Sequence, residues 1–463
     1  MILGLGAVGT ASVGAVPADG NSNATGDGPA VATSVERVGE GGTLRYELTL
    51  TGLAEYDRVG IVVGRAATVV ASEGLTATER EGRTWLRAAD GRETATVRIR
   101  TTVSAARPGR GGEFFPADTW LLGRVPLVEL RWTNGAGIDR RRLLDDVGSG
   151  SGRVTAGDRY VLVGDQRTRT VATAGGEIRI AWPAGTALGP DADALAAALS
   201  DAAGRLDVGD RGDAVLLFAL GDPARRGGES FPGFDEAWVD ADSPLDDPNS
   251  VWLHEYVHTR QEFVLAPGMR WFREASAEYY AARLAYEQGR IDRVAMSGHL
   301  DGEPVTATLT EPRSWDDPYV PYTKGARVLA LLDRKIRLST DGERSLEDVF
   351  RRLNAHEGPV TYDDFTDAVA AVAGHRMDGW LDRYVAGDEP VASFYPGVPE
   401  RSGLFAGSWS FIADAGPGGV FLVLSVLLSA VGSVPLYRYL DRLDDGDGDG
   451  DADDRDGRSS WPA

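Results

Sequence analysis

Residues 254–258 read His-Glu-Tyr-Val-His, and residues 271–280 read WFREASAEYY. The first segment is an H-E-x-x-H motif, in which His254 and His258 are four positions apart. On a helix this spacing places both imidazoles on one face, where they can bind one metal ion. A carboxylate directly after the first histidine, here Glu255, can take a proton from a metal-bound water. The motif therefore predicts a helix that carries a hydrolytic metal site.

The segment Ala266-Pro267-Gly268 separates the two stretches and predicts that a second helix opens near Trp271. A short connection makes two helices antiparallel neighbours, so a carboxylate early in the second helix can face the same ion. Glu274, 16 positions after His258, is the candidate. Two imidazoles and one carboxylate leave the fourth tetrahedral position open for water, which is typical of a catalytic Zn²⁺ site.

The two stretches together resemble the gluzincin metallopeptidases of clan MA, the branch that includes thermolysin, aminopeptidase N and glycyl aminopeptidase. In that branch the second helix typically reads W-x-x-E-G-x-A-x-Y. The resemblance implies that Glu274 is the third zinc ligand. It also implies that Glu278, one turn further along the helix, hydrogen-bonds the imidazole of His254. The resemblance covers about residues 155–390 and implies a thermolysin-like zincin catalytic domain.

A third segment, Val-Pro-Tyr-Thr-Lys-Gly-Ala at 320–326, precedes a predicted helix over 327–336. It is similar to a P-Y-x-K-G segment of aminopeptidase-type gluzincins, whose tyrosine donates a hydrogen bond to the oxyanion of the tetrahedral intermediate. The resemblance assigns that role to Tyr322, and a neutral phenol on a rigid ring suits it. The alternative is a tyrosine that only packs at the start of a helix.

The sequence departs from the aminopeptidase pattern in several places. Ala275 replaces the usual glycine, and Arg273 stands where aminopeptidases often have asparagine. No G-x-M-E-N segment is present, and the glutamate of that segment captures the free amino end of the substrate. Glu229 or Glu236 could substitute for it. The sequence therefore leaves exopeptidase and endopeptidase activity equally open.

Composition narrows the chemistry. The 463 residues include no cysteine, which excludes disulfides, thiolate metal sites and cysteine nucleophiles. The net charge is −22, which argues against nucleic acid as a partner because phosphate contacts need a basic face. Lys324 and Lys335 are the only lysines. An acidic, lysine-poor chain resembles proteins of salt-loving archaea, in which surface carboxylates keep the protein hydrated.

The pattern along the chain predicts an α+β fold in two parts. Leu44–Thr51 alternates apolar and polar residues, as a half-buried strand does. Similar strands are expected at 59–63, 96–103 and 127–132. Together these strands predict a β-sandwich over 31–154. The catalytic domain is expected over 155–390, with strands first and helices after residue 245. Its predicted strands lie at 160–163, 178–182, 214–220 and 237–239, and its first helix at 191–206.

Both ends of the chain suggest export and membrane anchoring. Residues 1–18 are apolar with small residues near their end, as in a signal peptide, and a linker is expected over 19–30. After a linker at 391–414, residues 415–437 carry no charge and are long enough to span a bilayer. Arg438 and Arg442 follow, which predicts that the acidic tail at 438–463 is cytoplasmic and the catalytic domain extracellular.

Of the remaining histidines, His299 is expected in a loop with glycine and aspartate, and His356 and His375 near predicted helix ends, all three in surface or capping roles. Together these features predict a membrane-anchored, extracytoplasmic zinc metallopeptidase that acts on peptide or protein substrates. Two alternatives remain open. One is a surface-anchored binding protein with an inactive zincin domain, and the other is a zinc hydrolase that acts on a non-peptide bond. No oligomeric state is predicted.

Overall fold

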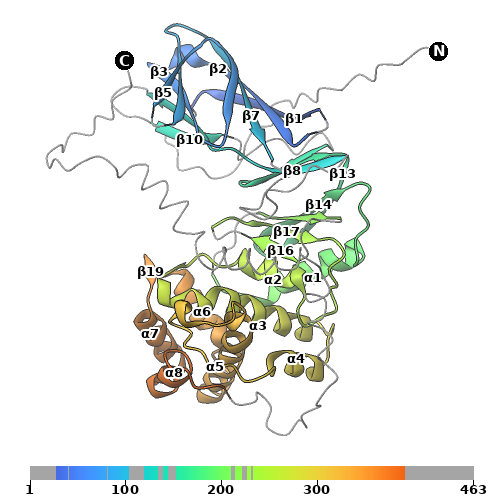
Figure 1. Ribbon diagram of the computed structural model, residues 1–463, viewed down its shortest axis with the longest axis vertical. Coiled ribbons are helices and arrows are strands. Elements are labelled where there is room, and N and C mark those ends of the chain that lie inside the picture. Colours follow the sequence, from blue (N-terminus) through green and yellow to red (C-terminus); the bar gives the residue numbers. More distant parts are fainter. Residues whose placement is uncertain are drawn as a thin grey trace, which may run out of the picture. The chain divides into compact units, whose positions relative to one another are not determined.

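The computed structural model describes residues 28–391, except residues 40, 81, 104–118, 134–138, 144–152, 210–213, 222–226 and 231–232. The chain forms two compact units, which are described separately (Figure 1). The described part of the first unit runs to Arg167 and includes Pro183–Gly185. The second unit comprises Thr168–Trp182 and the described residues from Thr186 onward.

The first unit consists of antiparallel sheets. Its strands are β1 (Ala30–Val38), β2 (Thr43–Thr51), β3 (Arg58–Val63), β4 (Thr68–Glu73), β5 (Leu75–Arg80), β6 (Arg83–Ala88), β7 (Thr94–Thr102), β8 (Trp120–Arg124), β9 (Val128–Thr133), β10 (Asp139–Leu143), β11 (Val154–Ala156) and β12 (Tyr160–Gly164). They form a four-stranded sheet in the order β1-β2-β7-β4, a five-stranded sheet in the order β10-β9-β3-β6-β5 and a three-stranded sheet in the order β11-β12-β8.

The alternation that the sequence shows in β2 builds the core of this unit. Leu44, Tyr46 and Leu48 are fully buried, while the residues between them are partly exposed. Successive side chains of a strand point to opposite faces, so these residues all face inward. They share one hydrophobic cluster with Ile61 and Leu130 of the five-stranded sheet. The two larger sheets therefore enclose a common core, as a β-sandwich requires.

The first unit extends further along the chain than the expected boundary at residue 154. The run at Tyr160–Val163, which was assigned to the catalytic domain, pairs with β8. Val161 and Val163 belong to the same hydrophobic cluster as the sandwich strands. The boundary therefore lies after Arg167, because a hydrogen-bonded partner rather than a change in composition decides to which sheet a strand belongs.

The second unit begins with a mixed sheet. Its elements are β13 (Gln166–Thr173), β14 (Gly176–Pro183), α1 (Ala192–Arg205), β15 (Ala214–Leu220), β16 (Gly228–Ser230) and β17 (Glu236–Asp240). The strand order is β13-β14-β15-β17-β16. Strands β14, β15 and β17 are parallel neighbours, while β16 runs antiparallel to β17 at the end of the sheet.

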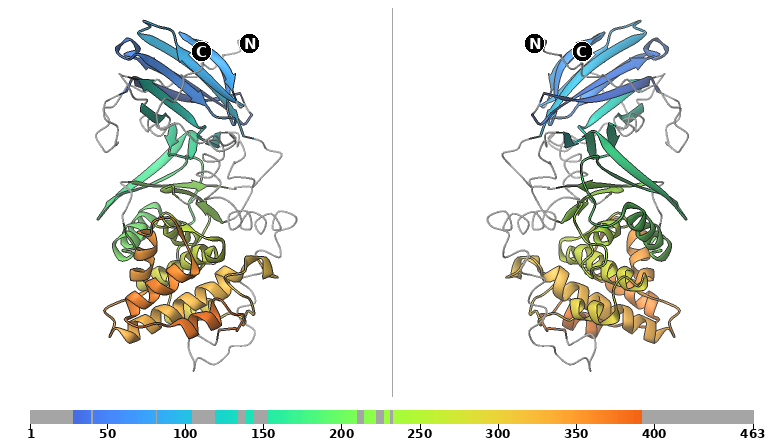
Figure 2. Two further views of the ribbon diagram at one scale, coloured as in Figure 1. Left: turned by 90° about the vertical axis from the view of Figure 1, so that its left-hand side faces the viewer. Right: turned by 90° about the vertical axis from the view of Figure 1, so that its right-hand side faces the viewer.

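Helices follow the sheet and gather on one side of it (Figure 2). They are α2 (Val251–His258), α3 (Trp271–Glu287), α4 (Arg293–Leu300), α5 (Ala326–Ser339), α6 (Leu346–Asn354), α7 (Tyr362–Ala373) and α8 (Asp378–Tyr384). Short 3₁₀ turns lie at Leu53–Glu55, Pro267–Met269 and Pro312–Ser314, and a π-helical turn lies at Pro321–Gly325. A two-stranded sheet is formed by β18 (Val264–Leu265) and β19 (Pro359–Val360). The predicted order of strands followed by helices, and with it the α+β fold, is confirmed.

Helix α2 is buried along almost its whole length, from Trp252 to His258. The Trp252 indole Nε1 donates a hydrogen bond to the carbonyl of Ser243 at 2.9 Å. Ser250 is the N-cap of this helix, and its side chain makes no capping hydrogen bond. Packing on all sides, rather than a cap, therefore holds this helix.

The expected membrane segment at 415–437 lies outside the described residues, as do the segments 1–18 and 438–463 and nearly all of both linkers. Among the residues that the structure describes, no helix has the length and apolar character needed to cross a membrane.

A buried aspartate ties the helices of the second unit together. Asp333 of α5 accepts hydrogen bonds from the Tyr279 hydroxyl of α3 at 2.8 Å and from the Leu346 amide at the start of α6 at 2.7 Å. Arg337 donates to it from the next turn of α5 at 2.9 Å. Because α3 also carries Glu274, this contact helps to fix the helix that supplies a predicted metal ligand.

Replacing Asp333 by alanine should destabilise the protein by about 3–5 kcal/mol, because it leaves buried donors unpaired. Chemical denaturation of the purified protein measures this effect. Asp367 is a matched control, since its side chain is 68% exposed and its ion pair with Arg376 lies at the surface. Asp367→Ala should change the stability by less than about 1 kcal/mol. Equal stability of the two variants would contradict the role given to Asp333.

Candidate metal centre

Helices α2 and α3 bring the three predicted ligands together. The Nε2 atoms of His254 and His258 lie 3.1 Å apart. The Glu274 Oε2 atom lies 3.2 Å from the His258 Nε2 and 3.5 Å from the His254 Nε2. All three residues are buried, and they form the one group of potential metal ligands found within the described part of the chain.

These distances fit a tetrahedral metal ion. Ligand atoms bound to Zn²⁺ at about 2.1 Å are separated by roughly 3.4 Å along each tetrahedral edge. The observed separations of 3.1–3.5 Å form such a triangular face. Two imidazole nitrogens and one carboxylate oxygen are also the donor set of catalytic zinc sites. The three side chains could therefore hold one divalent metal ion without rearrangement.

Each imidazole has a separate partner on its Nδ1 atom. The His254 Nδ1 lies 3.2 Å from the Glu278 Oε2, the contact that the family resemblance implies. The His258 Nδ1 lies 2.9 Å from the Gln261 Oε1. An acceptor at Nδ1 keeps the proton there and leaves Nε2 free to bind a metal.

Gln261 was not predicted from the sequence. It lies in the connection between the two helices, where its Nε2 donates to the Arg273 carbonyl at 2.8 Å and to the Ser276 hydroxyl at 3.0 Å. These bonds to α3 orient the amide so that its oxygen faces His258. The spacing of three residues after His258 was the available signal, but only the course of the connection shows that the amide turns back to the helix.

His299 lies in this network, in the last turn of α4, and not in a loop with a surface or capping role, so the expectation for this residue is wrong. Its Nε2 on α4 lies 2.7 Å from the Glu278 Oε1. Glu278 is thus held between two imidazoles, those of His299 and His254. Although burial opposes ionisation, the hydrogen bonds from His254 and His299 lower the pKa of Glu278 to about 2. The carboxylate is therefore ionised and can accept both bonds.

Glu255 is placed beside the three ligands with one unused oxygen. Its side chain is buried, and its Oε2 has no hydrogen-bond partner among the described residues. Burial raises the pKa of Glu255 above its usual value. A buried carboxylate oxygen without a partner is costly, and a water molecule on a metal ion at this place would satisfy it. This feature agrees with the site being built for such an ion.

The edge strand β16 comes close to Glu255. A Cβ atom at Gly228 would lie 2.6 Å from the Glu255 Cγ, so the strand requires glycine at that position. Figure 1 shows β16 and β17 above α2. The next residue, Glu229, contributes to the raised pKa of Glu255, which places its charge within electrostatic reach of the site. Glu236 lies instead on β17, where it is buried.

Tyr322 also reaches the cluster. Its hydroxyl donates to the Glu274 Oε2 at 2.7 Å, and its ring is stacked on that of His254 with centroids 5.8 Å apart. Burial and the nearby Glu274 raise the pKa of Tyr322 well above its usual value, so the phenol keeps its proton. The residue belongs to a π-helical turn, an irregularity that often marks functional sites. Lys324 anchors this turn through bonds to the carbonyls of Ala307 and Gly387.

Comparison with solved structures identifies a protein with the same fold. No protein-family model and no curated protein sequence matches the chain. An aminopeptidase N family protein from Idiomarina loihiensis superposes with a TM-score of 0.53 and 14% sequence identity, covering 78% of this chain and 77% of that one. The chain shares the fold of that aminopeptidase N family protein.

Yeast LTA4 hydrolase, in its native form, matches with a TM-score of 0.35 and 12% identity over 82% of this chain and 68% of its own. The same enzyme in complex with bestatin matches with a TM-score of 0.36 and 11% identity over 83% and 68%.

Replacing His299 by leucine should weaken zinc binding about tenfold, because outer contacts to metal-bound histidines typically change affinity by about 10–100-fold. Competition with a chromogenic chelator measures the affinity of the refilled protein. His356 is the matched control, since it is half-buried and its ion-pair partner is Asp364, 3.6 Å away, rather than a residue of the ligand cluster. If His299→Leu and His356→Leu bound zinc equally well, the network would not support the metal site.

Proposed function

We propose that this protein is a zinc peptidase, and that it removes residues from the free amino end of peptides. The observation that carries the hydrolytic assignment is the buried Glu255 oxygen without a partner beside three converging ligand atoms. The donor set favours zinc over other divalent ions. The fold shared with an aminopeptidase N family protein supports a peptidase as the class of enzyme, by analogy of fold.

A zinc ion bound at this site would supply Lewis acidity, which acidifies a water molecule and polarises the carbonyl of the substrate. The Glu255 carboxylate accepts a proton from the water whose oxygen adds to the carbonyl carbon. It then delivers that proton to the nitrogen that leaves when the C–N bond breaks. Glu278 and Gln261 hold the two imidazoles in position throughout.

Tyr322 is proposed to stabilise the negative charge that develops on the carbonyl oxygen. Its phenol is protonated and lies beside the ligand cluster, and its hydroxyl would exchange the bond to Glu274 for one to that oxygen. Both the ring stacking on His254 and the anchored π-helical turn restrict its movement. A donor that is held in place before the reaction loses little entropy when the charge forms.

Glu229 supports the preference for a free amino end. It lies on the edge strand next to Gly228, where an extended peptide could pair with the sheet and present its ammonium group to the carboxylate. Of the two acids that could take this role, Glu229 is among the charges that raise the pKa of Glu255. Glu236 has its side chain buried within β17. Glu229 is therefore the proposed amino-end anchor.

The location of the protein is also part of the proposal. We propose that residues 415–437 anchor the protein in the membrane with its catalytic unit outside the cell. The uncharged run followed by Arg438 and Arg442 supports this orientation. Protease treatment of intact cells should remove the catalytic unit and leave the acidic tail protected; recovery of the whole chain from the soluble fraction would contradict anchoring. The acidic, lysine-poor composition supports a saline environment.

Glu255→Gln should lower kcat by about 10²–10⁴-fold while the bound zinc stays stoichiometric, because the amide cannot carry the proton. Cleavage of a peptide library at high salt with zinc, paired with metal analysis, measures both quantities. Glu262→Gln changes an exposed glutamate and should leave the rate unaltered. If wild type and Glu255→Gln are equally inert, the binding-protein alternative is favoured, and zinc-dependent turnover of esters alone would favour a non-peptide hydrolase.

Glu229→Gln should raise KM for an aminoacyl nitroanilide about 10–100-fold, because a charge-assisted hydrogen bond to the ammonium group is lost. The wild type should also prefer this substrate strongly over its N-acetylated form, and the variant should lose most of that preference. Glu177→Gln is the control, because this glutamate of the same sheet pairs with Arg179 away from the metal ligands. Equal cleavage of free and acetylated substrates by the wild type would indicate an endopeptidase.

A further inference from the structure

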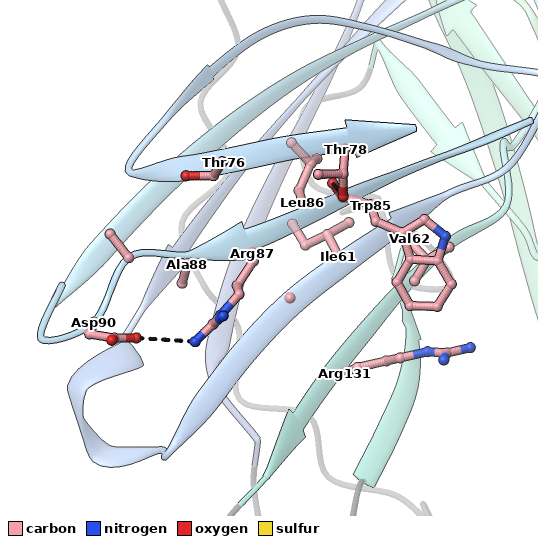
Figure 3. Close-up of a pocket in the computed structure, with 12 residues that line it drawn as sticks. Ile61, Val62, Thr76, Thr78, Trp85, Leu86, Arg87, Ala88, Asp90 and Arg131 are labelled. Atoms are coloured by element: carbon pink, nitrogen blue, oxygen red, sulfur yellow. Dashed lines mark hydrogen bonds and ion pairs between the residues drawn. The ribbon is translucent and has the colours of Figure 1, made fainter. Parts of the chain in front are cut away.

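A pocket of about 290 Å³ lies in the first unit, on the outward face of the five-stranded sheet (Figure 3). Strands β3, β5, β6 and β9 and the turn after β6 contribute its lining. The residues that line it include Gly60, Thr76, Trp85, Arg87, Asp90 and Arg131. The pocket lies entirely within the first unit, so it is distinct from the metal cluster of the second.

The strand register explains why the sheet is hollow here. Gly60 of β3 stands between Arg131 of β9 and Arg87 of β6 in one row across the sheet. Thr76 of β5 continues the row beyond Arg87. Because Gly60 has no side chain, the row has a gap at its centre with long side chains on either side. The neighbouring residues in β3, including Ile61, point inward to the core.

The walls of the pocket combine an aromatic ring with groups that form hydrogen bonds. Trp85 is half-buried, and the Arg131 guanidinium lies 4.8 Å from the centroid of its ring. Arg87 pairs with Asp90 at 3.5 Å, and Arg131 pairs with Glu129. Figure 3 shows Arg87 directed toward Asp90 and Arg131 beside the indole ring.

This pairing decides the class of ligand. Each guanidinium already has a carboxylate partner, so the pocket offers little net charge to bind an ion. A guanidinium has five N–H groups, however, and a pair with one carboxylate leaves donors for other oxygens. Hydroxyl groups can also bond to the Asp90 carboxylate and the Thr76 hydroxyl. A ligand that fits must therefore be neutral, rich in hydroxyls, and apolar on one face to contact Trp85.

We propose that this pocket binds a pyranose ring of a neutral saccharide. A sugar ring presents C–H groups on one face and hydroxyls around its rim, which matches a pocket with the Trp85 indole at one side and Arg87, Asp90 and Thr76 at the other (Figure 3). The volume lies at the lower end of the range for small-molecule sites, so it holds a single ring. Strand β5 is the end of the sheet, so the rest of an oligosaccharide can continue past that edge.

Isothermal titration of the full chain with hexasaccharides of glucose, mannose and N-acetylglucosamine tests the proposal. At least one of them should bind, and Trp85→Ala should weaken that binding about tenfold, while Trp85→Phe should retain most of it. Arg87→Ala should weaken binding as well. Arg45→Ala is its matched control, because Arg45 is a similarly exposed arginine that pairs with Glu36 on the other large sheet. It should bind like the wild type.

Absence of binding by all three saccharides overturns the proposal, as does equal binding by Trp85→Ala and the wild type. Binding of an acidic hexapeptide in place of the saccharides also overturns it, since that outcome would identify an anion site. Thermal unfolding of each variant shows that it is folded. Peptidase activity on a small chromogenic substrate should be the same in Trp85→Ala and the wild type, so the outcome does not depend on the proposed function.

Discussion

The site depends on the approach of three ligand atoms in a buried place. The His254 and His258 nitrogens and the Glu274 oxygen lie 3.1–3.5 Å apart with almost no access to solvent. Lone pairs so close together are unfavourable unless a cation or shared protons lie between them. The packing of α2 against α3, the amide of Gln261 and the carboxylate of Glu278 hold the atoms there. The helices of the second unit thus serve to hold these three ligand atoms close together.

The two imidazoles receive unlike support, and the difference has a chemical meaning. His254 bonds to a carboxylate that is itself held by His299, whereas His258 bonds to a neutral amide. A carboxylate partner raises the basicity of an imidazole more than an amide does. One ligand is therefore a stronger donor to the metal than the other. Since α4 carries His299, the position of that helix is linked to the strength of the metal site.

The two units use their sheets in different ways. In the second unit, the edge strand approaches Glu255 at Gly228, and the charge of Glu229 on the same strand acts on that carboxyl group. In the first unit, a glycine within the five-stranded sheet opens a pocket beside Trp85 on the outward face. The missing side chain of Gly228 makes room for Glu255, whereas that of Gly60 leaves a space in which a ligand could lie. A zinc peptidase with a separate saccharide pocket would combine cleavage of a peptide with attachment to a glycan.

The spacing of residues along the chain was sufficient to predict the features that depend on the periodicity of a single helix or strand. The four-residue separation of His254 and His258 and the alternation in β2 follow from the geometry of one helix and one strand. The proline–glycine break allowed Glu274 to be placed beside them. Gln261, His299 and the edge strand with Glu229 could not be assigned in this way. Their positions depend on where a connection turns back, how α4 packs and which strands pair. These are contacts between residues distant in sequence, and only the tertiary structure fixes them, because no local pattern encodes a partner that lies on another element.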